Sequence, residues 1–512
     1  EHAIRDLDSS LVGSEMCIRD RCIACLFFPI KSDAQNEIDA LRYSQSIYGP
    51  TARSMSMGGA FGALGGDFSV LSTNPAGIGV YRSSEFTVSV GSISRNTNSE
   101  FQGQTWDDNK FNITLGNLGL VLVKTNTERD ANWKQLSFAI GHNRTNDLGT
   151  NSYFQGRNFN NSMTDYFAER VNLDGGASPS ELSSFYPFDA SLAYQTFLID
   201  PHPNIPNNYV SIIPDGDILQ SRTVTSKGSQ GEFSFALGAN YRNKFNFGIS
   251  FAFPNIKYEE EAIFEETDTD DSVINADSTA DFKSMRYTQL LKTTSNGFNA
   301  KFGVIYRLTD GIRLGAAYHT PTWYNMSDVY VTSMRSIVNN TEYYDVSPDG
   351  AYGYKLHTPM KFVGSVAFIF SKKGLLSFEY EYSDLTSMKL KANDYSFNNE
   401  NQTIDNIYTK NGHVFRGGAE IRLERLSLRA GGAYYNSPFN KKVIPGDDFD
   451  QHVISFAGGI GYKVKNFTLD LAYSYSERSE FYRAYNLLNE EVPGTGIDRI
   501  DHRIMLTTGV RF

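Results

Sequence analysis

The chain has 512 residues, a formal net charge of -11 and 13% aromatic residues, with 36 Phe and 30 Tyr. The acidic excess argues against a nucleic-acid partner, because phosphate binding needs Lys and Arg in excess. The aromatic residues and the 43 glycines favour β-structure over a helical bundle. No apolar run approaches the ~18 residues of a spanning helix. A mean hydropathy of -0.38 is nevertheless compatible with a membrane β-barrel, whose strands expose only alternate residues to lipid.

The first 34 residues are expected to be a non-native leader and the remnant of a signal peptide. The segment from Cys22 to Gln35 has a short apolar run followed by a small-x-small cleavage site that ends at Ala34. A lipid anchor on Cys25 is the competing interpretation. Residues 9–21 resemble translated sequencing-adapter DNA. All three cysteines lie in this leader, so the rest of the chain needs neither a disulfide nor a thiolate metal site.

Residues 35–83 form a glycine-rich segment that neither a helix nor a ladder strand would tolerate well. Six glycines fall between Met57 and Ile78. Glycine allows close backbone approach and positive φ angles. The alternative is a flexible linker, but residues such as Phe61 and Phe68 are too apolar for a solvated one. The stretch closes with a turn signal, Asn74-Pro75-Ala76-Gly77.

From residue 84 to 512 the main signal is alternation of apolar and polar residues in long runs. In "NFTLDLAYSYS", Phe467, Leu469 and Leu471 share one face, opposite Thr468 and Asp470. We predict an all-β fold, an antiparallel transmembrane β-barrel of about fourteen strands. The strands are predicted to begin near residues 84, 110, 134, 231, 245, 284, 311, 351, 374, 404, 426, 450, 467 and 499.

Short and long connections alternate along this region, as in outer-membrane barrels, which have short turns at one rim and long loops at the other. The long, polar connections are predicted near residues 259–283, 333–350, 392–403, 438–449 and 479–498, with one long extracellular insertion near 146–230. A soluble β-sandwich is the alternative. Strands of ten or more residues argue against it, because strands in globular proteins usually have five or six.

The lipid sets the orientation of the charged residues on the strands. A charged side chain on the lipid face costs ~2–4 kcal/mol at the midplane, so such residues are expected to face the lumen. The predicted lumen-facing charges are Arg313, Arg416, Glu420, Arg422, Asp470, Arg503 and Arg511.

Two helices are predicted inside the long insertion. One begins at the capping box of Ser178, with Pro179 at the first helical position, and the other covers residues 161–171. The apolar residues that follow form either a small satellite core of the loop or a surface patch that gathers an apolar ligand. These residues are Tyr194, Phe197, Leu198 and Ile199.

The glycine-rich segment ending in Asn74-Pro75-Ala76-Gly77, directly before a fourteen-strand barrel, resembles the long-chain fatty acid transporter (FadL) family. This family includes the toluene and xylene uptake channels. The resemblance covers residues 43–512 in layout, and it is specific only at residues 57–78 and at the C-terminal Phe512. It implies an N-terminal hatch inside the lumen, carrying Asn74 to Gly77, and import of hydrophobic molecules across the outer membrane.

In that family, release is thought to pass sideways through a gap in the wall, and two wall defects are visible here. Pro254 removes a donor from the hydrogen-bond ladder. Around Gly116 and Asn117 the alternation slips in phase, which indicates a β-bulge. Either defect is a candidate lateral exit, although bulges at barrel rims are commonly structural.

We therefore expect a monomeric outer-membrane barrel of a Gram-negative bacterium for the passive uptake of fatty acids or aromatic hydrocarbons. The expected partners are the apolar ligand, outer-membrane lipid and lipopolysaccharide, and the barrel-assembly machinery. Catalytic and metal motifs do not occur in the sequence, so neither an enzyme nor a cofactor or metal is expected. The alternatives are a barrel component of type IX secretion and a structural porin-like barrel.

Overall fold

The computed structural model describes residues 37–46, 49–128, 130–213, 216–269, 281–371, 373–441 and 450–512. The predicted leader lies outside these residues, as does most of the predicted connection at 438–449. No helix among the described residues is long and apolar enough to cross a bilayer.

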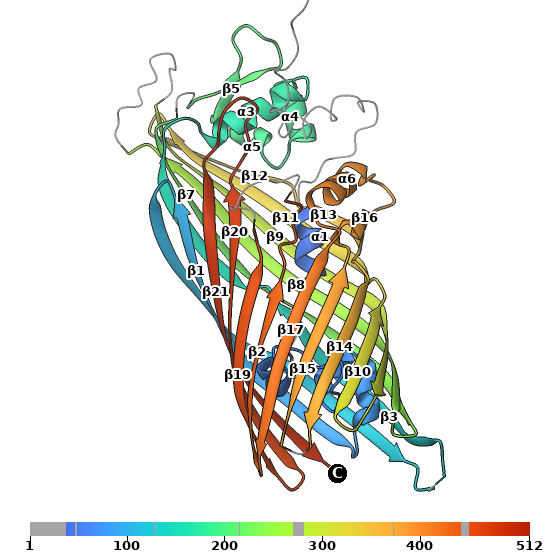
Figure 1. The fold of residues 1–512 in the computed structure, drawn as a ribbon. Helices are drawn as coiled ribbons and strands as arrows, with labels where there is room; N and C mark the ends of the chain where they lie inside the picture. Colours follow the sequence, from blue (N-terminus) through green and yellow to red (C-terminus); the bar gives the residue numbers. More distant parts are fainter. Residues whose placement is uncertain are drawn as a thin grey trace, which may run out of the picture.

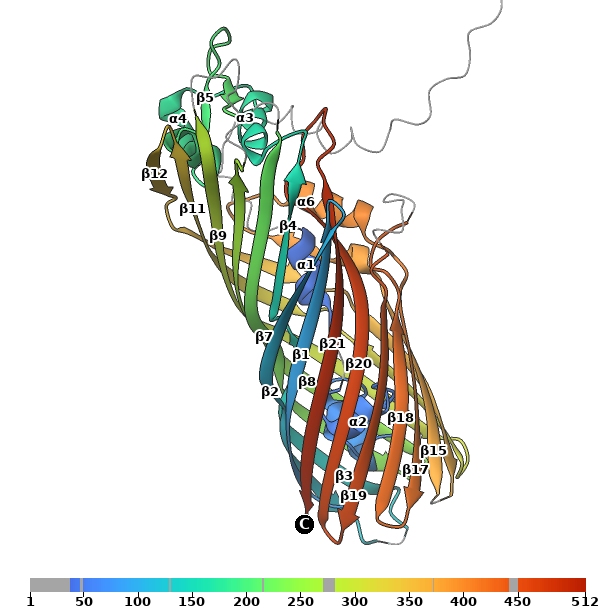
Figure 2. The same cartoon turned by 90° about the vertical axis from the view of Figure 1, so that its left-hand side faces the viewer.

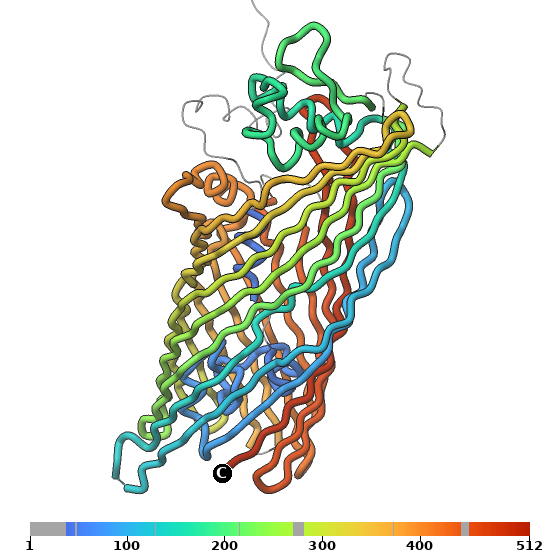
Figure 3. Tube along the Cα trace, turned by 180° about the vertical axis from the view of Figure 1, so that it is seen from behind, coloured from blue at the N-terminus to red at the C-terminus, as the bar shows by residue number. Residues whose placement is uncertain are grey.

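The strands form one closed antiparallel barrel, because β1 (Glu85–Phe101) pairs with both β2 (Gln104–Thr125) and the last strand, β21 (Gly494–Arg511). Figures 1 and 3 show this barrel from opposite sides. Strands that continue one another along the same neighbour count as one, and the described wall then has fourteen strands. The predicted fold class and strand number are confirmed. The others, in wall order, are β3 (Trp133–Asp147) with β4 (Thr150–Asn158), β7 (Ile218–Tyr241), β8 (Phe245–Thr267), β9 (Phe282–Arg307), β10 (Ile312–His319) with β11 (Trp323–Val338), β12 (Thr341–Val346) with β13 (Gly350–His357) and β14 (Lys361–Phe370), β15 (Gly374–Ser383) with β16 (Lys389–Lys391), β17 (Gly412–Leu423), β18 (Leu426–Tyr435), β19 (Val453–Val464) and β20 (Phe467–Arg483).

The outer face of the wall is apolar and the inner face is polar. In β20 the side chains of Phe467, Leu469 and Leu471 are exposed, whereas Ala472 is buried against the interior. In water these exposed rings and aliphatic chains would be unfavourable, and in hydrocarbon they are not. The alternation of apolar and polar residues therefore favours a strand and also determines which of its side chains face outward.

The two rims differ in their connections. At the lower rim, where the C-terminus lies, most turns are tight, and residues such as Arg242, Asn243 and Glu424 adopt positive φ (Figure 1). The upper rim carries the long connections. Two of its turns are nevertheless tight, at residues 102–103 and at Asn339-Asn340, where both asparagines have positive φ, at 52° and 58°. The tight turn at Asn339-Asn340 shows that the long loop predicted at 333–350 is wrong.

Strands on one side of the barrel continue well beyond the apolar band. β8 reaches Thr267. β4 occupies the start of the predicted insertion and β7 occupies its end, so the inserted residues outside the wall are only 159–217. The sequence concealed these extensions because outward positions above the band, such as Asn255 and Lys257, are polar and exposed, so the lipid-type alternation ends before the strand does.

Two predicted strand starts are wrong, and the first is that of β7, which begins at Ile218 and not near 231. Residues near 404 form α6 (Asn398–Ile407), and the strand β17 begins only at Gly412. Ile404 is fully buried, and Ile407, three residues further on, packs against the same cluster. This spacing places both side chains on one helical face.

The insertion is a small folded unit above the barrel. It contains α3 (Met163–Leu173), α4 (Pro179–Phe185), α5 (Ala190–Gln195) and a hairpin of β5 (Ile199–Pro201) and β6 (Tyr209–Ser211). Both predicted helices are present, and the capping box at Ser178 is formed with Glu181.

The N-terminal segment, residues 37–46 and 49–83, lies within the ring of strands (Figure 2). Its elements are α1 (Glu37–Ser44), α2 (Ala52–Ser56) and two 3-10 turns, η3 (Phe68–Leu71) and η4 (Pro75–Val80). Helix α1 packs near α6 towards the upper rim, and α2 packs against β18 to β21 lower in the barrel.

Candidate functional site

Asn74 joins the N-terminal segment to two wall strands. Its Oδ1 accepts a hydrogen bond from the backbone N–H of Ala76 at 3.1 Å, which caps η4, and Pro75 occupies the first turn. Its Nδ2 donates to the carbonyl of Gly62 within the segment at 2.7 Å, and lies 3.3 Å from the carbonyl of Val304 in β9. The fully buried amide therefore connects the segment with the wall.

Glycines in the N-terminal segment and in the wall allow the two backbones to approach each other closely. A Cβ on Gly58 would lie 2.5 Å from the carbonyl oxygen of Gly432 in β18, and one on Gly418 would lie 2.5 Å from that of Met57. Gly248 in β8 faces the backbone of Pro75 and Ala76 in the same way. These particular wall glycines were not singled out in the sequence, because a strand glycine is also the ordinary sign of a bulge.

Charged side chains hold α2 to the lower part of the wall. Arg53 Nε donates to Glu420 Oε2 at 3.1 Å, and the carboxylate of Glu420 also accepts from Arg422 and Arg429. Asp470 accepts from Arg429 Nη1 at 2.6 Å. Arg53 was not among the predicted residues, although Glu420, Arg422 and Asp470 were.

The other predicted charges also lie on the inner face. Arg313 donates to the carbonyl of Leu64 at 2.9 Å, and Arg416 bridges Glu379 and Glu381. Glu379 also accepts from the backbone N–H of Gly62 at 2.6 Å.

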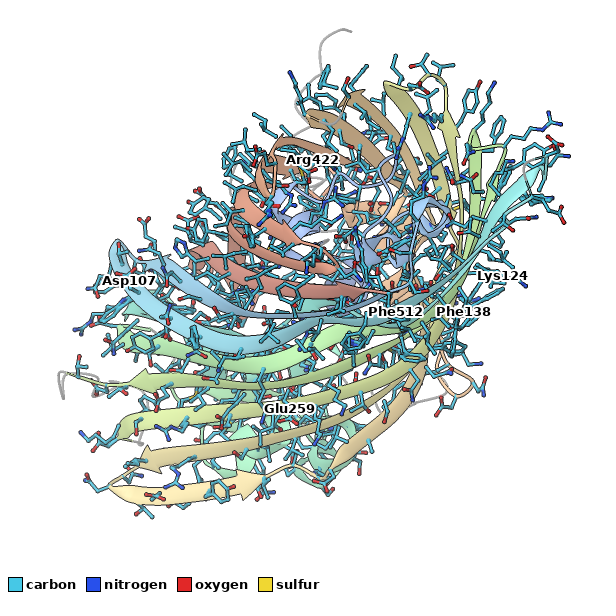
Figure 4. All side chains as sticks on the ribbon, turned by 90° about the horizontal axis from the view of Figure 1, so that it is seen from below. Asp107, Lys124, Phe138, Glu259, Arg422 and Phe512 are labelled. Carbon is cyan, nitrogen blue, oxygen red and sulfur yellow. The ribbon has the colours of Figure 1, made fainter. Side chains whose placement is uncertain are left out.

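Two of the predicted charges are on β21. Arg503 pairs with Asp501 at 3.1 Å, and Arg511 pairs with Glu85 at 2.5 Å. Arg422 is partly exposed at the lower rim, the end seen in Figure 4.

A cavity of about 200 Å³ lies between the N-terminal segment and the wall. Its apolar lining includes Leu41, Met55 and Met505, and its charged lining includes Arg144 and Arg478. An engineered cavity of ~150 Å³ holds benzene, so this volume admits one aromatic ring or a short part of an acyl chain. The mixed lining suits an amphipathic ligand.

Helix α1 carries a buried carboxyl, that of Asp39. Burial raises the pKa of Asp39 to about 7, and the nearby Arg42 guanidinium, 2.5 Å away, opposes that rise. No group of three or more metal-ligating side chains occurs among the described residues.

Gly116 and Asn117 form a bulge in β2. The register with β1 shifts between Ser89 and Val90, which leaves Gly116 unpaired, so the expected irregularity is present. Gly116 lines the cavity, where a Cβ would lie 2.5 Å from the carbonyl oxygen of Pro50. This defect therefore adjoins the cavity.

Pro254 lies at a second interruption. β8 and β9 pair up to Ala252–Asn299 and again from Asn255–Asn296, which leaves Phe253 and Pro254 unpaired with β9. Pro254 faces a smaller cavity of about 50 Å³ that also borders Lys301 and His319.

Sequence reasoning missed two further prolines near this interruption. Pro321 lies in the break between β10 and β11, and Pro359 lies in the break between β13 and β14. The two breaks face each other, because Thr322 and Thr358 exchange hydrogen bonds at 3.0 Å. Asn299, opposite Ala252, also bonds Thr322 at 3.0 Å. Proline within strand patterns was the available signal.

The apolar residues of the insertion take different positions. Leu198 and Ile199 are fully buried in its core, where Tyr194 packs partly. Phe197 is 48% exposed and contacts the ring of Tyr343. The packing of Leu198 and Ile199 favours the satellite-core interpretation, and only Phe197 offers a substantially exposed ring.

Comparison with solved structures identifies the architecture. A FadL homologue from Pseudomonas aeruginosa aligns with a TM-score of 0.54 and 13% identity over 91% of this chain and 100% of its own. The chain has the fold of FadL-type channels. The P. putida toluene transporter TodX has a TM-score of 0.51 and 13% identity over 91% of this chain and 99% of its own. The deltaS2 mutant of the TodX monoaromatic hydrocarbon channel has a TM-score of 0.51 and 14% identity, with the same coverage. No family model and no curated protein matches the sequence.

Proposed function

We propose that the chain is an outer-membrane channel for the passive uptake of hydrophobic small molecules, either fatty acids or aromatic hydrocarbons. The observation that carries this proposal is the cavity between the N-terminal segment and the wall, inside a barrel whose outer face is apolar. Solved barrels of the same fold are named as a toluene transporter and a hydrocarbon channel, which supports a channel and not an enzyme.

In this proposal the N-terminal segment is the hatch, and Asn74 to Gly77 are its anchor to β8 and β9. An apolar molecule enters from the extracellular side, rests in the cavity, and leaves when the segment shifts. A porin-like barrel without a substrate would not need a segment that contacts most of the wall. A secretion barrel would need a wider lumen, whereas here α2, η3 and η4 pack directly against the inner face.

The bulge at Gly116 and Asn117 is the favoured lateral exit because Gly116 borders the cavity. The interruption at Pro254 is the second candidate. A cross-link tests the choice: cysteines at Asn117 and its β3 neighbour Asn143, joined by a disulfide, are expected to block uptake if the exit is at the bulge. Unchanged uptake in the cross-linked protein would favour the interruption at Pro254.

Cells with and without the gene are compared for uptake of labelled oleate and of toluene. We expect faster uptake of at least one compound when the protein is present. Ser474→Trp fills the cavity from β20 and is expected to reduce that uptake towards the level of cells without the gene. Tyr473→Trp changes the neighbouring, exposed residue and serves as the matched control. Equal uptake of both compounds with and without the gene would refute the proposal.

A further inference from the structure

A cluster of basic side chains lies on the outer face of the wall at β13 and β16. These strands pair antiparallel, with Lys355 opposite Lys391 and His357 opposite Lys389. Leu356 and Leu390 are the intervening pair, and both are buried, at 0% and 1% exposure. Because side chains alternate between the faces of a strand, the three lysines and the histidine point to the outside.

The cluster lies at the upper edge of the apolar band. His357 is also opposite Trp323 in β11, whose exposed ring stacks on Phe298 with 6.3 Å between ring centroids. The next outward residue of β11 is polar: Asn325 is opposite Lys355. Aromatic belts of this kind mark the boundary between hydrocarbon and headgroups. The basic cluster is therefore at headgroup depth.

The positive charge of this cluster has no internal compensation. Like charges directly opposite each other on neighbouring strands destabilise the pairing. None of the ion pairs among the described residues involves Lys355, Lys389 or Lys391. Three uncompensated lysines side by side are unusual on a chain with a net charge of -11.

A second outward set of lysines behaves differently. Lys227 in β7 and Lys292 in β9 both pair with Glu259 in β8, at 2.7 and 3.4 Å. There the wall supplies its own counter-charge. The contrast indicates that the counter-charge at β13 and β16 comes from outside the chain.

We propose that Lys355, Lys389 and Lys391, with His357, bind the phosphate groups of a phosphorylated glycolipid in the outer leaflet, as in lipopolysaccharide. Lysine ammonium groups bind phosphate oxygens as point charges, and clustered lysines at a membrane surface attract anionic lipid additively. Trp323 supports the acyl part of the same lipid. This inference rests on the outer-membrane location proposed above, and it does not depend on which compound the channel carries.

The purified barrel, in a neutral detergent, is mixed with bisphosphorylated lipid A, and the bound fraction is measured by native mass spectrometry. The triple variant K355Q/K389Q/K391Q is expected to bind about tenfold less than the unaltered protein. The control K227Q/K257Q/K292Q removes the same number of outward charges elsewhere and is expected to retain binding within about twofold. Fully dephosphorylated lipid A is expected to bind the unaltered protein as weakly as the triple variant binds the phosphorylated lipid.

Three outcomes would overturn the site: equal losses in both variants, undiminished binding of the dephosphorylated lipid, or displacement of the lipid by an equimolar amount of inorganic phosphate. Electrophoresis without heating checks that both variants are folded barrels. Uptake of the transported compound is expected to be unchanged in K355Q/K389Q/K391Q cells. If the unaltered protein supports uptake but does not bind lipid A, only the lipid site is refuted. If it binds lipid A but does not support uptake, only the channel function is refuted.

Discussion

Two segments outside the strands pack against the inner face of the wall, and they do so differently. Against residues 49–83 of the N-terminal segment the wall presents glycines and small residues, among them Ala139, Ala236 and Ala367, whereas α1 meets large wall side chains, such as Tyr258. Against the insertion it presents large side chains, such as Phe264 and Tyr287. Large interdigitated side chains fix a contact, whereas a smooth surface with a few polar bonds leaves room for displacement. The comparison fits a fixed unit at the upper rim and a movable segment inside the barrel.

The largest effect is expected from Phe167→Ala in the insertion. Phe167 is 1% exposed and contacts the ring of Tyr287 on β9, so its loss is expected to cost ~3–5 kcal/mol. Hydrogen exchange is expected to show opening of α3 with the barrel amides still protected. Phe159→Ala, at a residue 63% exposed, is the control. Protection of α3 equal to the control would contradict an interlocked core.

A smaller effect is expected where the wall is smooth. In Gly248→Val the new side chain would overlap the backbone of Pro75 and Ala76, and we expect ~1–3 kcal/mol of destabilisation, confined to the N-terminal segment. Faster exchange in residues 49–83 and higher ion conductance in planar bilayers would report its displacement. Gly364→Val adds the same side chain on the outer face, where a Cβ meets nothing within 4 Å. If both variants conduct alike, the close approach at Gly248 does not hold the segment.

Arg53→Gln tests the contact between the N-terminal segment and the wall by removing a single charge. The Arg53–Glu420 pair is largely buried, but Glu420 keeps Arg422 and Arg429 as partners, so the loss is expected to be ~1–2 kcal/mol. The segment is then expected to open more often, with a modest rise in conductance at low salt and little at high salt. Arg82→Gln, an exposed residue of the same segment, is the control. A salt-independent rise would argue against an electrostatic contact.

The smallest expected effect is a pH dependence of the stability of the insertion. Burial raises the pKa of Asp165 from 3.8 to about 7, so the folded insertion holds a proton that the unfolded one has lost. Its stability therefore falls as the pH rises from about 4 to about 7, by roughly 1 kcal/mol because Asp165 is partly exposed. Hydrogen exchange of α3 across this range measures the slope. Asp165→Asn retains the capping acceptor and is expected to reduce the slope. The remaining slope comes from Glu266, which accepts hydrogen bonds from Ser162 and Met163 and whose pKa burial also raises to about 7. An unchanged slope would assign the whole effect to Glu266.

Local signals in the sequence predicted much of this architecture. Alternation identified the fourteen strands because hydrocarbon on one side and a polar lumen on the other impose opposite demands on successive residues. The capping box at Ser178 identified α4 because the first N–H groups of a helix need a local acceptor. The candidate site could be predicted less well from the sequence, because Arg53 and the wall glycine Gly248 contact residues that are far away in the chain.

The sequence by itself determined the number of strands, the face that each presents, and the turn at Asn74, because these depend on solvent and on neighbouring residues. The tertiary structure alone decided how far β7 to β9 extend, which glycines meet the N-terminal segment, and that Lys355 lies beside Lys391. Those features depend on the register between strands, and register is set by the closed barrel as a whole.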